Sequence, residues 1–307
     1  MLLHGQPGLK ADWQPVIAAL PESLHAIAID RPGHGSSQQP GGGLEVNAAA
    51  VLDALDGHGI DRAVLVGHSY GGGVAQQVAA TAPDRVEALV LLASVGPDCL
   101  NIFDWLLAAP VAGALASRFA WQLTPALARA VVRLLATRGT RHPNWQVWGH
   151  ARWDNGPLWR TFLAEQRALV SEAPAFARLA ASVTVPALVV TDPRDALVPF
   201  KTAAALSNAL PDARLHLIEG AGHHLPLRMP EQVAGQIVAF LESLAPEPAG
   251  LQRADLLRLR TLGPLRGGEL DALVLLEAAE PVGEYGGMVD KDVSTTVVRR
   301  DEAVALG

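Results

Sequence analysis

The stretch AVLVGHSYGGGVAQQVA, residues 63–79, decides the fold. It opens with an apolar run that predicts a buried strand, and it closes with a segment, Val74–Ala79, that predicts a helix. Between them GHSYG has the form G-x-S-x-G, in which small residues two before and two after the serine allow a sharp strand-to-helix turn. Such a turn holds Ser69 in strained backbone at a helix N-terminus, where free N–H groups and the helix dipole favour developing negative charge. We therefore interpret Ser69 as a nucleophile rather than as part of an ordinary glycine-rich turn.

Further apolar runs alternate with segments of helical length on both sides of this stretch. Leu24–Ile29 and Glu87–Leu92 are predicted as strands, as are Ala187–Thr191 and Ala213–Ile218, and a last helix is predicted to start near Pro230. An alternation of strands with helices is typical of a parallel sheet covered by helices on both faces. The sequence therefore predicts a three-layer α/β fold with a mostly parallel sheet.

The strand signal is interrupted in the middle of the chain. Residues 97–182 read as helices rich in Trp, Ala and Arg, so 1–96 and 183–245 are predicted to form one α/β domain with a helical insertion. A Pro-rich linker then leads into residues 246–307, which are charged, punctuated by Gly and only weakly periodic. A flexible tail and a small ordered element both stay open for this last part, including strands that cover an exposed sheet edge.

Composition narrows the possible functions. Half of the 307 residues are apolar and 18% are charged, which is typical of a folded protein with a sizeable core. The 24 basic and 31 acidic residues give a net charge of −7, which argues against nucleic acid as a partner. A single cysteine, Cys99, excludes an internal disulfide framework and a cysteine metal cage. Without a signal peptide or an apolar stretch of about 20 residues, we expect a cytoplasmic protein that does not bind membranes.

A serine nucleophile needs a base, and the base needs an acid that orients it. The segment GAGHH, residues 220–224, follows a predicted strand, and its His223 or His224 can reach the serine. His223 directly follows the glycine turn and is preferred. Asp192 and Asp195 both follow the strand before it; Asp195 is preferred, because aspartate directly after a strand often shapes a turn. The resulting order of serine, acid and histidine is the one expected on α/β-hydrolase sheets.

Two further loops follow predicted strands. In LLHGQPG, residues 2–8, Pro7 lacks an N–H, so Gln6 is the natural backbone donor to an oxyanion, and the N–H of Tyr70 is the second. DRPGHGS, residues 30–36, lacks the lysine and the spacing of a phosphate loop, and we interpret it as a structural turn near the site in which the aspartate orders loops. No dinucleotide motif is present, and neither a cofactor nor a metal is expected.

The motifs HGQPG, DRPGHGSS, GHSYGG, DALVP and GAGHHLP, in this order over residues 1–245, resemble the α/β-hydrolase fold superfamily. The resemblance implies that Ser69, His223 and Asp195 are nucleophile, base and acid, that Gln6 and Tyr70 are the oxyanion donors, and that the helical insertion is a cap. Members with a nucleophilic aspartate, such as haloalkane dehalogenases and epoxide hydrolases, have Asp where this chain has Ser. The chain begins inside the strand before the HG loop, so the N-terminal strands of the family are expected to be truncated.

The expected reaction is hydrolysis of an ester or related acyl bond of a small apolar molecule. A C–C bond hydrolase, a cofactor-free haloperoxidase, a thioesterase and a non-catalytic binding protein are the alternatives on this fold.

Six of the seven Trp residues lie between positions 105 and 159. Trp145, Trp148 and Trp153 are assigned to an apolar substrate pocket, although simple packing of the helices explains them equally well. The oligomeric state stays open.

Overall fold

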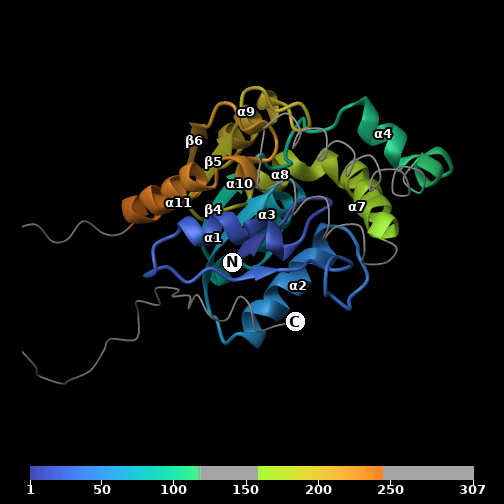
Figure 1. Ribbon diagram of the computed structural model, residues 1–307. Helices are drawn as coiled ribbons and strands as arrows, with labels where there is room; N and C mark the ends of the chain where they lie inside the picture. Colours follow the sequence, from blue (N-terminus) through green and yellow to red (C-terminus); the bar gives the residue numbers. More distant parts are fainter. Residues whose placement is uncertain (117, 119–157, 245–307) are drawn as a thin grey trace, which may run out of the picture. The chain divides into compact units, whose positions relative to one another are not determined.

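The computed structural model describes residues 1–116, 118 and 158–244, and its central feature is a parallel sheet (Figure 1). The six strands of the described part run in the order β2-β1-β3-β4-β5-β6, and every neighbouring pair is parallel. The predicted α/β class with a parallel sheet is confirmed. In chain order the strands are β1 Leu2–Leu3, β2 Ala28–Ile29, β3 Ala63–His68, β4 Val86–Leu92, β5 Ala187–Thr191 and β6 Ala213–Leu217.

The sequence predicts the four central and C-terminal strands to within two residues, but it overestimates the strand at Leu24–Ile29. Only Ala28–Ile29 is a strand there. A turn closed by the Leu24 N–H on the Pro21 carbonyl, at 3.0 Å, occupies the start of the predicted run. The partner of β2 is β1, which is itself two residues long, so no further ladder bonds are formed.

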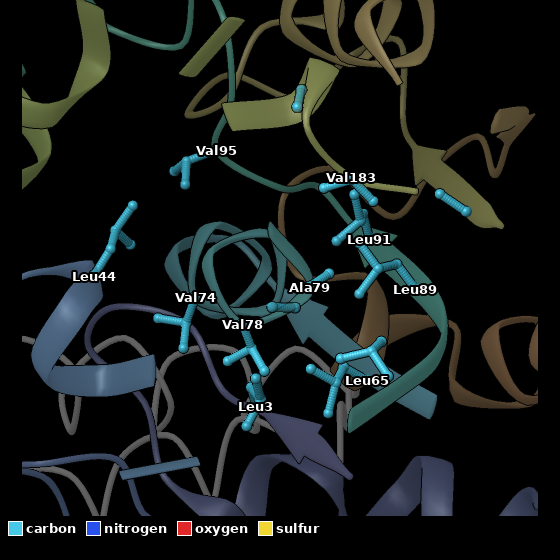
Figure 2. Close-up of a cluster of buried hydrophobic side chains, with 14 of the residues drawn as sticks. Leu3, Leu44, Leu65, Val74, Val78, Ala79, Leu89, Leu91, Val95 and Val183 are labelled. Carbon is cyan, nitrogen blue, oxygen red and sulfur yellow. The ribbon is translucent and has the colours of Figure 1, made fainter. Parts of the chain in front are cut away.

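One face of the sheet packs against a layer of helices. This layer contains α2 (Leu44–Gly57), α3 (Tyr70–Thr81), α8 (Phe176–Ala181) and α9 (Phe200–Ala209). Figure 2 shows apolar side chains around α3, with Val74 and Val78 of the helix near Leu3 and Leu65 of the strands. Nearly all residues of α3 are buried, including the unbroken run from Tyr70 to Gln76, as is typical of a helix in the core of a domain.

The other face of the sheet is also buried. Val66, Val90 and Leu188 alternate with the residues of the first face and are at most 5% exposed. Outside the segment between β4 and β5, the other described helices are η1 (Lys10–Trp13), α1 (Gln14–Ala19), η2 (Pro83–Arg85), α10 (Leu225–Arg228) and α11 (Pro230–Leu244), of which η1, α1 and α10 pack together. Burial of both faces is typical of parallel sheets, and it explains why the strands read as continuous apolar runs.

The described part of the segment between β4 and β5 contains helices and loops but no strand. It contains α4 (Ile102–Ala108), α7 (Leu158–Glu172), η3 (Ala173–Ala175) and α8. Helices α4 and α7 pack against each other and lie side by side in Figure 1. The α8 helix instead contacts α3 and α9, and its Phe176 and Ala180 belong to the main core. The insertion is therefore anchored to the α/β core through its C-terminal end.

Several sequence predictions concern residues outside the described part of the chain. They are Trp145, Trp148 and Trp153 of the predicted pocket and the whole of the tail, residues 246–307. Among the residues that are described, no helix combines the length and the apolar character needed to cross a bilayer.

Truncation of a core leucine tests the packing of the sheet. Leu91 of β4 is fully buried, whereas Leu217 of β6 is 43% exposed. Leu91→Ala leaves a cavity, and we expect it to lower the free energy of unfolding by about 2–5 kcal/mol. Leu217→Ala removes the same atoms from a partly solvated position, and we expect it to lower the free energy of unfolding by about 0.5 kcal/mol. Urea unfolding followed by circular dichroism measures both; equal losses would contradict the described core.

Candidate active site

The carboxyl ends of the parallel strands bring the predicted site residues to one edge of the sheet. Ser69 follows β3, Asp195 lies four residues after the end of β5, and His223 lies in the loop after β6. His223 Nε2 is 3.0 Å from Ser69 Oγ, and His223 Nδ1 is 2.8 Å from Asp195 Oδ2. The structure thus joins these three side chains in one continuous hydrogen-bonded chain, although they are distant in sequence.

The turn at Ser69 is the sharp one that the motif predicts. Ser69 has φ 54° and ψ −120°, a conformation that few non-glycine residues adopt. Gly67 and Gly71 make it sterically possible, because a Cβ on Gly67 would collide with the backbone at Gly71 and one on Gly71 would lie 2.6 Å from the His4 carbonyl oxygen. The serine is 7% exposed and stands at the N-terminus of α3.

Hydrogen bonds determine which nitrogen of the His223 ring carries the proton. Asp195 Oδ1 accepts from the backbone N–H groups of Leu197 and Val198 at 2.8 and 2.9 Å, which fixes the carboxylate and turns Oδ2 toward the imidazole. A carboxylate accepts, so the proton of the neutral ring is on Nδ1 of His223 and its Nε2 is free to accept from the Ser69 hydroxyl. In this arrangement the imidazole is ready to take a proton from the serine.

Asp192, the alternative acid, has a different environment. Its carboxylate accepts from the backbone N–H groups of Arg194 at 2.8 Å and Gly222 at 2.6 Å, and its side chain is fully buried. It therefore links the loop after β5 to the loop that carries His223. Burial alone would raise the pKa of the Asp192 carboxyl, but backbone N–H groups, first among them those of Arg194 and Gly222, lower it below the ordinary value.

The loop after β1 lies against Ser69. A Cβ on Gly5 would come within 3.0 Å of Ser69 Cβ, so Gly5 borders the serine directly. The side chain of Gln6 is turned to α7, where its Nε2 donates to the Phe162 carbonyl at 2.9 Å and to Gln166 Oε1 at 3.4 Å. The side chain of Gln6 is therefore bound by α7.

Tyr70, the residue after the serine, is buried. Its side chain is 1% exposed, and its ring lies 5.0 Å from the guanidinium carbon of Arg31. Burial, with a smaller contribution from Glu165, raises the pKa of the phenol, which keeps it neutral. As the first residue of α3, Tyr70 has an N–H that makes no hydrogen bond within the helix.

Sequence reasoning missed a buried polar cluster beside this loop. Arg31, in the segment interpreted as a structural turn, pairs with Glu165 of α7, and neither side chain is exposed to solvent. Burial raises the pKa of the Glu165 carboxyl, and the guanidinium opposes that shift. The signal available was the position of Arg31 two residues after the end of β2, at the same sheet edge as the serine. Its partner lies 134 residues away in a helix with no distinguishing motif.

His68 is a second group that the sequence did not single out. Its Nε2 donates to the His223 carbonyl at 2.8 Å, and the two rings are 5.0 Å apart. The residue before the serine therefore helps to hold the backbone of the histidine loop.

The pKa of Asp192 gives a testable dependence of stability on pH. Because this pKa is lower in the folded chain, the ionised carboxylate stabilises the fold at neutral pH, and that contribution is lost as the pH falls below about 5. Asp192→Asn should therefore be less stable than the wild type at pH 7, with the gap narrowing in acid. Urea unfolding at several pH values measures the gap, and Asp84→Asn, at an exposed position, is the control. A gap that stays constant with pH would contradict this role.

Comparisons with known proteins agree with the fold. The family described as the alpha/beta hydrolase fold matches residues 1–228. The chain is 30% identical over 258 residues to pimeloyl-(acyl-carrier protein) methyl ester esterase of Pectobacterium carotovorum, covering 79% of this chain and 94% of that protein. It is 28% identical over 245 residues to 2-hydroxymuconate semialdehyde hydrolase of Pseudomonas putida, covering 72% and 78%. A thermophilic esterase from Thermogutta terrifontis has a similar structure, with a TM-score of 0.65 and 22% identity over 79% of this chain and 88% of that one. Because the family model spans most of its length, the chain belongs to the α/β-hydrolase fold family.

Proposed function

We propose that this protein hydrolyses an ester or related acyl bond of a small apolar molecule, with Ser69 as nucleophile, His223 as base and Asp195 as the orienting acid. The observation that supports it most is the continuous chain of hydrogen bonds from Ser69 Oγ through the imidazole to Asp195. Relatives named as an esterase and as a hydrolase support the same class of reaction. The apolar character of the substrate rests on the Trp-rich sequence of the insertion.

The geometry supports the following steps. Ser69 Oγ attacks the acyl carbon while its proton passes to Nε2 of His223, and Asp195 stabilises the imidazolium through Nδ1. The N–H groups of Gln6 and Tyr70 stabilise the negative oxygen of the tetrahedral intermediate. The leaving alcohol takes the proton from the imidazolium as its bond to carbon breaks, which leaves an acyl-serine. A water molecule, deprotonated by His223, then attacks the acyl-serine. The bond to Ser69 Oγ breaks, the serine oxygen takes the proton from the imidazolium, and the carboxylic acid is released.

Replacement of the nucleophile tests the proposal. Ser69→Ala should lower the turnover of p-nitrophenyl acetate by about 10⁴-fold or more, because no acyl-enzyme can form. The release of p-nitrophenol measures the rate. Equal rates for the wild type and the variant would refute the assignment of Ser69. A folded wild type that neither turns over esters nor reacts with a fluorophosphonate would favour the non-catalytic binding protein.

The two adjacent histidines provide a matched pair. His223 contacts Ser69 and Asp195, whereas His224 precedes α10 and uses its backbone carbonyl to cap that helix. His223→Gln should lower kcat by at least about 10³-fold, since the base is lost. His224→Gln should keep most of the activity and the same pH profile. Loss of activity in the His224 variant alone would reverse the assignment.

A second candidate on the same residues is hydrolysis of a C–C bond. The likeness to a protein named 2-hydroxymuconate semialdehyde hydrolase favours it. A panel of esters of increasing acyl length and of diketone substrates would separate the two, because the preferred class gives the higher kcat/KM.

A further inference from the structure

The buried guanidinium of Arg31 uses every hydrogen-bond donor that it has. A guanidinium carries five N–H groups. Nε donates to the His4 carbonyl at 2.9 Å, and Nη1 donates to Asn47 Oδ1 at 2.7 Å and to Glu165 Oε1. Nη2 donates to the Gly5 carbonyl at 3.0 Å and to Glu165 Oε2 at 3.3 Å. With all five donors matched to acceptors, the orientation of the side chain is fully determined.

Two of these acceptors are carbonyls of the loop that borders Ser69. The Gly5 carbonyl belongs to the same planar unit as the Gln6 N–H, and this peptide is trans. In a trans peptide the C=O and N–H bonds point in opposite directions. By holding the Gly5 oxygen, Arg31 therefore also sets the direction of the Gln6 N–H, which points away from the guanidinium.

His4 provides a second donor to the same carbonyl. The backbone N–H of Arg31 donates to His4 Nε2 at 3.0 Å, so the ring proton lies on Nδ1, which is 2.8 Å from the Gly5 oxygen. The Gly5 carbonyl oxygen thus accepts one hydrogen bond from the charged guanidinium of Arg31 and one from the neutral ring of His4. Hydrogen bonds in series polarise one another, so donors on the carbonyl strengthen the N–H of the same peptide as a donor.

Glu165 keeps the cation in this place. A buried guanidinium without a counter-charge is costly, and the bidentate carboxylate compensates it. Glu165 lies on α7, and the same helix also binds the side chain of Gln6 through the Phe162 carbonyl and Gln166. The inserted segment therefore contacts the loop beside the serine in two ways, through the guanidinium and through Gln6 itself.

We propose that Arg31, held by Glu165, is a positioning residue that orients and polarises the Gly5–Gln6 peptide toward the oxyanion. This inference rests on the proposed function, in which the Gln6 N–H is an oxyanion donor. Helix α7 is then part of the catalytic unit and not only a cover for it.

The rate at which an alkyl fluorophosphonate labels Ser69 tests this in the full-length chain. In that reaction the Oγ–P bond forms, the serine proton passes to His223 and fluoride leaves, while a phosphoryl oxygen gains charge as the acyl oxygen does. Glu165→Gln should be labelled about 10-fold more slowly than the wild type or slower still, because a misdirected donor loses part of its effect. Labelling should still go to completion, and kcat for p-nitrophenyl acetate should fall with little change in KM.

A glutamate of the same helix provides the control. Glu172 also ties α7 to the core, since its carboxylate accepts from the Leu44 N–H at 3.1 Å, but it does not contact the loop at Gly5. Glu172→Gln should label close to the wild-type rate. Equal rates for the Glu165 and Glu172 variants would overturn the positioning role.

A double variant separates positioning from stability. Arg31→Met combined with Glu165→Met removes both charges together, which buried ion pairs often tolerate without loss of stability. We expect its thermal midpoint to return toward that of the wild type while labelling stays slow. If the thermal midpoint and the labelling rate both recovered, the pair would have only a structural role and the proposal would be overturned. Wild-type labelling without ester turnover would instead contradict the proposed function and leave the labelling comparison intact.

Discussion

At Ser69 the chain passes from β3 into α3 with a positive φ, a conformation that costs about 1–3 kcal/mol in a non-glycine residue. Its surroundings hold it there. The Ser69 N–H donates to the Leu92 carbonyl at 2.9 Å, and its carbonyl accepts from Gly72 and Val95 at 2.9 and 3.2 Å. These bonds tie the turn to the end of the neighbouring strand. The loops that carry the other groups are arranged around this one point.

The sequence predicted this part of the molecule well because its causes are local. A G-x-S-x-G turn requires glycines at fixed spacing, and buried parallel strands require continuous apolar runs, so both leave a pattern that can be read directly. The meeting of Ser69 with the loops after β5 and β6 also follows from topology, since parallel strands end at the same edge. Asp30 fits its predicted role as well: its carboxylate accepts from Lys10 and Ser36 backbone N–H groups at 2.8 and 3.0 Å.

The interactions that sequence reasoning missed are long-range and have no local pattern. Thr161, Glu165 and Glu172 recur at helical spacing on α7, and each hydrogen-bonds to the α/β core. In the sequence this face looks like an ordinary mixture of polar residues, of the kind expected toward solvent. Only the fold shows that this face contacts segments more than 100 residues earlier in the chain. Nothing near Arg31 in the sequence indicates which helix will supply its counter-charge.

The polar attachment of α7 has a consequence that apolar packing would not have. Apolar contacts are non-directional, and a helix held by them alone can shift slightly at little cost. A bidentate Arg31–Glu165 pair permits one orientation, and two of the remaining guanidinium donors pass that orientation to the His4 and Gly5 carbonyls. Buried pairs of this kind add little net stability compared with apolar residues of the same size. In the proposed reaction the value of the Arg31–Glu165 pair lies in direction, since stabilising an oxyanion depends on where an N–H points.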